Sequence, residues 1–309
     1  KIGIIGRVVM SLSRRGFLGA GLAAAIPNLS VATMMIGEHT LTTVSDGNLV
    51  LPGDFAFAGL PEDELSRILK ATGVNRDRVE PECNLALFRD GENTVLFDVG
   101  SGPDFMPTAG QIVDSLDALD LTPDDITHVL FTHAHPDHIW GLLDDFDDPL
   151  FYDATYFMGR AEWDYWWNPE TVNTIGDARA AFAAGAKRRM AIIEDQIEFF
   201  DDGDEVLPGI QAVASFGHTP GHMAFEVRQG NDAAMVVGDA IGNHHIAFSR
   251  PDWTSGADQI ADQAIAARKM LFDRITSEQM KIIGFHLPDG GMGHVDTLDG
   301  AYAFVADRA

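Results

Sequence analysis

The feature that most constrains this chain is a cluster of histidines that directly follows a short apolar stretch. Residues 133–138 read His-Ala-His-Pro-Asp-His, and the preceding residues 127–132 have the composition of a buried strand. A strand end is a rigid mount, and the loop after it can turn several side chains toward one point. Imidazoles and a carboxylate at this spacing suit a borderline divalent metal such as zinc. Because one ion cannot easily use all four side chains, the spacing favours two adjacent ions.

Three further candidate ligands lie far along the chain, and each comes just past a predicted apolar strand. His218 follows residues 210–215, Asp239 follows residues 233–237, and His286 follows residues 280–285. A lone histidine is more often a surface or core residue than a ligand. The repeated position after a strand instead predicts that these side chains converge on one cleft with the first motif.

At these residues the sequence resembles the metallo-β-lactamase-fold hydrolases, from about residue 41 to the C-terminus. The resemblance implies an α/β protein with mixed sheets, arranged as a four-layer αβ/βα sandwich with a dinuclear site at one edge of the paired sheets. It implies a first metal on His133, His135 and His218. It implies a second metal on Asp137, His138 and His286, with Asp239 bridging both. Asp98 and His222 match positions that orient the ligands from behind.

The chemistry implied by this resemblance is hydrolysis. Two ions about 3.5–4 Å apart share a water and lower its pKa, so that a bridging hydroxide can attack an electrophilic carbon or phosphorus. Asp137 and Asp239 are therefore the candidate catalytic residues, and Asp239 is also a candidate proton acceptor. Zinc is the expected metal, and manganese, cobalt and iron also fit such ligands.

The only cysteine of the chain, Cys83, bears on the choice of reaction. True β-lactamases of this fold use a cysteine where the related hydrolases place the bridging aspartate. Cys83 lies in a different region of the sequence from the proposed ligands, which argues against β-lactam hydrolysis.

The segments after Asp239 and around residues 284–294 look most like the methyl parathion hydrolase branch, which includes exported phosphotriesterases, esterases and lactonases. Asp289 and Gly290 depart from the more apolar pair expected near that pocket. Trp140 and Phe248 are the candidate pocket residues, since each lies close in sequence to a proposed ligand. The predicted function is cleavage of neutral esters, lactones or phosphotriesters.

Two alternatives stay open. A glyoxalase II-like thioesterase shares the first motif and a similar element at residues 219–222, but the chain lacks a recognisable basic C-terminal segment for the carboxylates of glutathione. A non-hydrolytic iron-binding redox protein of the same fold is the alternative of another class. The chain lacks the flavodoxin-like segment that one such type carries.

The N-terminus predicts export. Residues 13–18 read Ser-Arg-Arg-Gly-Phe-Leu, a twin-arginine pattern, and an apolar stretch and small residues follow up to Ala32. We expect residues 1–32 to be a leader for the twin-arginine route to the periplasm or beyond. Residues 1–9 precede the more conventional start at Met10 and are a candidate non-native extension. Residues 33–309 are then a single metallo-hydrolase domain.

The net charge of the chain limits the kinds of partner and substrate that it can bind. It has 47 acidic and 21 basic residues, a formal net charge of −26. Such a balance argues against nucleic acid, which needs a basic face, and against an anionic membrane surface once the leader is removed. It favours a small neutral or arylated ester-type substrate over an anionic one. The family resemblance also implies a homodimer.

Overall fold

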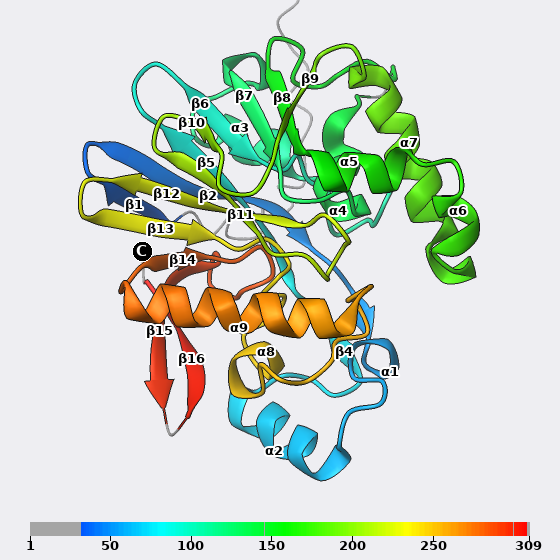
Figure 1. Ribbon diagram of the computed structural model, residues 1–309, viewed down its shortest axis with the longest axis vertical. Helices are drawn as coiled ribbons and strands as arrows, with labels where there is room; N and C mark the ends of the chain where they lie inside the picture. The colour runs from blue at the N-terminus through cyan, green and yellow to red at the C-terminus, as the bar shows by residue number, and fades with distance from the viewer. Residues whose placement is uncertain (1–31, 145, 299, 308–309) are drawn as a thin grey trace, which may run out of the picture.

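The computed structural model describes residues 32–144, 146–298 and 300–307. The predicted leader lies outside these residues, except for Ala32, and its role stays a prediction. Helices and strands alternate in clusters along the chain, and most strands belong to two large sheets (Figure 1).

The first sheet has seven strands in the order β1-β2-β5-β6-β7-β8-β9. Its first half is antiparallel, and the pairs from β6 to β9 are parallel, so the sheet is mixed. The strands are β1 (Thr33–Ile36), β2 (His39–Asn48), β5 (Glu82–Arg89), β6 (Thr94–Phe97), β7 (His128–Phe131), β8 (Thr155–Gly159) and β9 (Ile197–Phe200).

The second sheet also has seven strands, in the order β10-β11-β12-β13-β14-β15-β16. All of its pairs are antiparallel except β13 with β14, which are parallel and joined by the long helix α9 (Ala261–Ser277). The strands are β10 (Glu205–Leu207), β11 (Ile210–Ala214), β12 (Met223–Gln229), β13 (Asp232–Val236), β14 (Lys281–Ile283), β15 (Met292–Leu298) and β16 (Ala301–Ala306).

The two sheets pack face to face and carry helices on their outer faces. Phe97 of β6 and Phe225 of β12 meet between the sheets with ring centroids 5.2 Å apart. Helices α5 (Arg160–Trp167) and α7 (Ala180–Ile193) cover the first sheet, and α9 covers the second (Figure 1). Strands such as β5 alternate between the two cores, since both faces of the sheet are buried. The predicted four-layer αβ/βα sandwich is confirmed.

A small unit with its own core lies beside the second sheet. It contains β3 (Leu51–Pro52), α1 (Gly53–Ala56), α2 (Glu62–Thr72) and β4 (Arg78–Val79), and it packs against α8 (Ile246–Ser249). Three acidic residues in the first turn of α2 and a left-handed glycine, Gly73, at its end fix the bounds of that helix. The core of the unit is formed by Phe57, Leu65, Leu69, Val79, Ile246 and Trp253.

Two helices are shorter than their sequence patterns predict. The Ala-rich pattern of residues 177–199 predicts one helix, but α7 ends at Ile193 and residues 197–200 form β9, because their β-branched and aromatic side chains suit a sheet edge beside β8. The pattern of residues 107–119 also predicts a helix, which is limited to α3 (Ile112–Asp117). The remaining short helices are α4 (Pro136–Ile139) and α6 (Thr171–Thr174). Among the described residues, no helix has the length and hydropathy that a membrane span requires.

Asp46 on β2 fixes the loop between β6 and α3. Its fully buried carboxylate accepts backbone N–H groups of Ser101 at 2.8 Å, Gly110 at 3.1 Å and Ile112 at 3.0 Å. Burial raises the pKa of Asp46 to about 6, although these hydrogen bonds oppose the rise. The loop that it holds carries Phe105 and Met106, which line the cavity described below.

The raised pKa of Asp46 predicts that the free energy of unfolding depends on pH. A carboxyl with a folded-state pKa above its unfolded value contributes stability that is complete below pH 4 and is lost as the pH rises through 6. The free energy of unfolding of the natural chain, relative to Asp46→Asn, should therefore fall by roughly 3 kcal/mol between pH 4 and 7. Urea denaturation of both proteins across this range measures the difference. A difference that does not change with pH would contradict the assignment.

Candidate metal centre

The histidine motif lies at the end of β7 and runs directly into the single turn of α4. His135 has extended backbone angles and caps this helix, and Pro136 occupies its first position, where a missing N–H costs nothing. The chain therefore changes direction between His135 and Asp137. As a result, the side chains before and after Pro136 belong to two neighbouring clusters.

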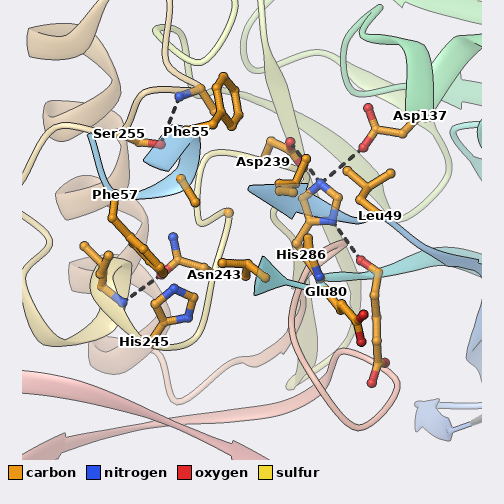
Figure 2. A pocket seen from close by; sticks show the side chains of 18 of the residues that line it. Leu49, Phe55, Phe57, Glu80, Asp137, Asp239, Asn243, His245, Ser255 and His286 are labelled. Atoms are coloured by element: carbon orange, nitrogen blue, oxygen red, sulfur yellow. Dashed lines mark hydrogen bonds and ion pairs between the residues drawn. The ribbon is translucent and has the colours of Figure 1, made fainter. Parts of the chain in front are cut away.

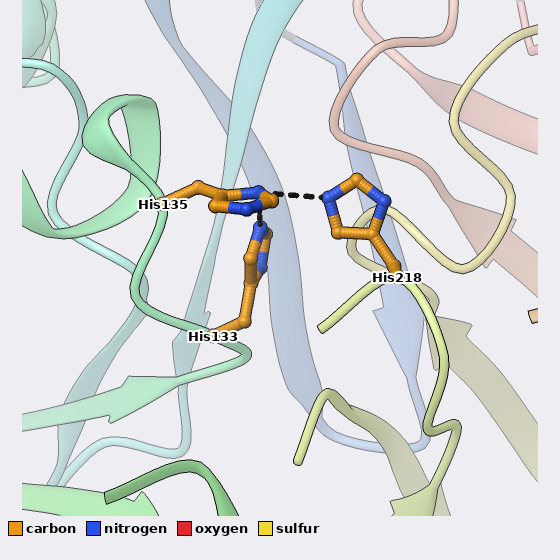
Figure 3. A group of neighbouring side chains, drawn as sticks. All are labelled: His133, His135 and His218. Carbon is orange, nitrogen blue, oxygen red and sulfur yellow. Dashed lines mark hydrogen bonds between the residues drawn. The ribbon is translucent and has the colours of Figure 1, made fainter. Parts of the chain in front are cut away.

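The first cluster contains three buried histidines, His133, His135 and His218 (Figure 3). His135 Nδ1 lies 3.0 Å from His133 Nε2 and 2.9 Å from His218 Nε2. His218 comes from the loop after β11 in the second sheet, so the cluster joins the two sheets. Asp239 lies beside it, with Oδ2 3.3 Å from His218 Nε2.

The second cluster shares Asp239 with the first. His286 Nε2 lies 3.2 Å from Asp137 Oδ2 and 3.4 Å from Asp239 Oδ2. His138 Nε2 lies 3.4 Å from Asp239 Oδ1 and 3.6 Å from Asp137 Oδ2. The structure thus brings together all seven predicted ligands, with Asp239 between the two groups.

The residues present fit two cations. His135 Nδ1 lies within 3.0 Å of ring nitrogens of both His133 and His218. A ring nitrogen of a neutral imidazole carries either one N–H or one lone pair, so it cannot form a full hydrogen bond with both neighbours. Two further buried atoms, His138 Nε2 and Asp239 Oδ1, have no hydrogen-bond partner among the described residues. Buried polar atoms of this kind require an explanation, and a metal ion on each cluster supplies one.

The charges of the side chains agree with this fit. Burial and the neighbouring histidines lower the pKa of His133 and His135 well below the usual range, which leaves them neutral, as metal ligands must be. Burial opposes ionisation of Asp239, yet the nearby His286 and His138 outweigh it and hold its pKa well below the usual range. At His138 the carboxylates of Asp137, Asp239 and Asp98 outweigh the effect of burial and raise the pKa of the imidazole to about 10.

Two predicted positioning residues lie directly behind the ligands. Asp98 accepts hydrogen bonds from Thr132 N at 2.7 Å and Thr132 Oγ1 at 2.8 Å, and its Oδ2 lies 2.8 Å from His138 Nδ1. His222 Nε2 accepts the backbone N–H of Asp239 at 3.0 Å. His222 Nδ1 contacts Ser215 Oγ at 2.7 Å, which leaves Nε2 free to accept. His222 therefore orients Asp239 through the backbone.

Sequence analysis missed Asp258, which supports His218. Asp258 Oδ1 lies 3.2 Å from His218 Nδ1, and Oδ2 accepts a hydrogen bond from the buried Arg268 at 2.9 Å. The sequence carried only a weak signal, because Asp258 reads as an ordinary acid at the start of α9. Its role follows from the turn of the chain before that helix, which brings Gln259 and Ile260 back to the loop of Gly217.

The expectation that Cys83 lies away from the proposed ligands was wrong. Its sulfur lies with ligand atoms of Asp137 and His286 within 4.8 Å of one another, so the residue borders the second cluster. Position along the sequence was misleading, because β5 passes beside the loop that carries His286. Burial raises the pKa of the Cys83 thiol to about 12. Asp239 nevertheless is the carboxylate that lies between the two clusters.

The two predicted pocket residues, Trp140 and Phe248, do not line the cavity at this site. Trp140 packs between Phe105 and the guanidinium of Arg189 on the outer side of the first sheet. Phe248 is fully buried against Phe272 and Phe304. Nearness to a ligand along the sequence did not place either side chain on the cavity wall, because α4 and α8 turn them into the helix–sheet cores.

A family model described as the metallo-beta-lactamase superfamily matches residues 79–279 of this chain. The chain belongs to this superfamily. An uncharacterised protein of Mycobacterium tuberculosis is 29% identical over 217 residues, which cover 66% of this chain and 87% of that protein. N-acyl homoserine lactonase AttM of Agrobacterium fabrum is 29% identical over 126 residues, 40% of this chain and 44% of that protein.

Solved structures share the fold. The dizinc quorum-quenching lactonase AidC and the hydrolase AbOPH each superpose with a TM-score of 0.83 at 24% sequence identity, over 90% of this chain and 98% of theirs. The predicted superfamily is therefore confirmed. The family and the paired clusters support a metal-dependent hydrolase with a dinuclear site. The methyl parathion hydrolase branch stays a prediction.

The contact between Asp258 and His218 predicts a loss of metal affinity. Asp258→Asn keeps the shape but removes the charged acceptor behind His218, so we expect zinc affinity to fall 10- to 100-fold. Asp252→Asn is the matched control, because Asp252 lies in the same segment, is exposed and, within the described part of the chain, has its ion pair with Arg250 alone. Competition titrations with a chelator measure both affinities. Equal affinities for the two variants would rule out this role.

Proposed function

We propose that this protein is a metal-dependent lactonase for neutral lactones that carry an apolar chain, with N-acyl homoserine lactones as the substrate class. The names of AttM and AidC support the choice of lactones. The observation that carries the proposal is a cavity of about 570 Å³ that opens directly onto the metal-ligand side chains. This volume lies in the range of small-molecule sites.

The walls of the cavity are largely apolar (Figure 2). The small unit supplies Leu51, Phe55 and Phe57, and other parts of the chain supply Phe105, Met106 and Phe182. His135, Asp137, His218, Asp239 and His286 line the end where the two clusters meet. An ester carbonyl can therefore lie at the ligands while an acyl chain extends between the apolar walls.

The charged groups around the cavity favour a neutral substrate. Among the described residues that line it, the arginines are Arg78, Arg179 and Arg268. Arg78 pairs with Glu80, Arg179 donates to the carbonyls of Gly256 and Ala257, and Arg268 pairs with Asp258. Each guanidinium is thus already bonded within the protein. This arrangement favours a lactone over a glutathione thioester, whose carboxylates need a cationic partner.

The chemistry divides between the metals and the protein. When bound, the two ions activate a water molecule and polarise the ester carbonyl. The histidines hold their geometry, and Asp98, His222 and Asp258 orient the ligands from behind. Water adds its oxygen to the carbonyl carbon, the bond to the ring oxygen breaks, and the water proton reaches that oxygen. We assign this proton transfer to Asp239, whose carboxylate lies between the clusters and lines the cavity.

Zinc is the metal that we propose at both positions. Five histidines form most of the donor set, and the sulfur of Cys83 borders the second cluster. Imidazole and sulfur neighbours favour zinc over magnesium or calcium, which prefer oxygen ligands.

A substrate panel tests the reaction. N-acyl homoserine lactones of increasing chain length, an aryl ester, a neutral phosphotriester and a glutathione thioester are assayed side by side with the zinc-loaded protein. We expect the highest kcat/KM on lactones, with KM falling as the chain lengthens, because each buried CH₂ adds about 0.8 kcal/mol. Faster turnover of the thioester or the phosphotriester would overturn the lactonase proposal.

Metal removal tests the centre itself. The purified protein should contain close to two metals per chain, and chelation should abolish activity that added zinc restores. His135→Ala should lose activity with little change in secondary structure, because this residue contributes a ligand atom at the cavity end. Leu51→Ala is the control, because it lines the same cavity and contributes no ligand atom. One metal or fewer per chain after reloading would refute a dinuclear site.

We further propose that the protein is exported by the twin-arginine route. The motif at residues 13–18 supports this, and the route suits a protein that folds around its metals first. Replacing Arg14 and Arg15 with lysine should keep the precursor inside a bacterium that has this route. Cell fractionation measures where the variant accumulates. Export of the variant at the normal level would contradict the proposal.

A further inference from the structure

Glu162 is a fully buried carboxylate that neither the sequence motifs nor the proposed reaction uses. It lies on α5, outside both histidine clusters, and has no exposed surface. Among the described residues no lysine, arginine or histidine pairs with it. A buried charge without a cation is expensive and persists only where strong hydrogen bonds hold it.

Four donors surround this carboxylate. Oε1 accepts the backbone N–H of Ala134 at 2.9 Å and the indole N–H of Trp166 at 2.6 Å. Oε2 accepts the hydroxyl of Thr219 at 2.7 Å and the backbone N–H of Gly221 at 3.0 Å. Each oxygen thus faces two donors, and these hydrogen bonds oppose the rise that burial causes in the pKa of Glu162.

Three of the four donors come from the two loops that build the first cluster, and the fourth, Trp166, stands on α5 itself. Ala134 stands between His133 and His135 on the loop after β7, in the first sheet. Thr219 directly follows His218 on the loop after β11, in the second sheet. One side chain therefore bonds to both halves of the site.

Close packing fixes this arrangement. A Cβ at Gly221 would lie 2.1 Å from the backbone nitrogen of Glu162, so the second loop lies directly against the start of α5. Only glycine permits this approach without displacing the backbone. The loop of His218 can then reach the carboxylate with its own N–H group.

We propose that Glu162 is a positioning residue that sets the distance between the histidine pair of the first loop and His218 of the second. It thereby sets the affinity of the first metal position. This inference rests on the metal centre of the proposed function, and it does not depend on which ester the protein cleaves.

Glu162→Gln tests the idea at constant shape. The amide replaces one acceptor oxygen with an NH₂ group, and each oxygen of Glu162 faces a backbone N–H. The amide should turn its NH₂ toward Thr219, whose hydroxyl can also accept, and this leaves the N–H of Gly221 opposite a donor. The loop of His218 then loses its attachment, while the Ala134 bond is kept.

The experiment measures zinc content and affinity by metal analysis after dialysis against graded chelator. We expect about two zinc ions in the natural protein, and in Glu162→Gln at least a tenfold weaker binding of one of them. Thr219→Val, which removes one of the four bonds, should weaken the same ion by a smaller factor. Thermal unfolding of the metal-free proteins separates this effect from general destabilisation.

Glu226→Gln is the matched control. Glu226 is also a buried carboxylate, but it bonds to Arg228 of β12 and Arg274 of α9, away from both loops. The Glu226→Gln variant should lose stability and keep the zinc affinity of the natural protein.

Two results would overturn the inference: a zinc affinity of Glu162→Gln equal to that of the natural protein, or an equal loss of zinc affinity in Glu226→Gln. If Glu162→Gln does not fold, unchanged affinity in Thr219→Val overturns it instead. A natural protein that binds no metal would refute the metal centre, which is a separate result.

Discussion

The rest of this structure depends on the buried carboxylate of Asp239, which lies between two groups of histidines that come from both sheets. Its oxygens are within 3.4 Å of nitrogens of His138, His218 and His286. A carboxylate at such depth is stable only beside positive charge or strong hydrogen-bond donors, and the groups beside the Asp239 carboxylate are imidazoles. In the absence of metal, protons on His138 and His286 supply that charge, as their raised pKa values indicate. Metal binding must therefore displace protons, so affinity should rise with pH up to the pKa of these imidazoles.

The ligands could be predicted from sequence because each follows a short apolar strand. Strands at the centre of buried sheets are nearly continuous apolar runs, and they end where polar residues begin. His133, His218 and His286 all lie just after such an end, in β7, β11 and β14 respectively. Sandwich architecture then places the ends at one edge. The same local reasoning gave the bounds of the four strands that precede ligands, β7, β11, β13 and β14, within a few residues. It failed at residues 197–200, where the alanine-rich pattern concealed β9.

The surrounding residues could not be predicted, because their roles depend on contacts between distant segments. Glu162 reads as one exposed acid of an amphipathic helix, yet it lies against the loop of Gly221. Asp258 reads as a helix start, and Cys83 as an ordinary core residue of β5. The opposite error occurred at Trp140 and Phe248, where sequence nearness to a ligand suggested a pocket but side-chain direction led into the core. Chain direction after a motif is set by tertiary packing, which one sequence does not reveal.

The cavity and the metal centre are built from different parts of the chain, and this separation has a chemical consequence. The ligands stand on the ends of the two large sheets, whereas much of the apolar wall comes from the unit of β3, α1, α2 and β4, with a core of its own. Substitutions at Leu51, Phe55 or Phe57 change the shape of the wall without moving a ligand-bearing strand. In the proposed lactonase, chain-length preference and bond cleavage are therefore separable properties. A wall substitution should alter KM across a lactone series and leave kcat on the shortest lactone nearly unchanged, because that lactone contacts mainly the ligand end.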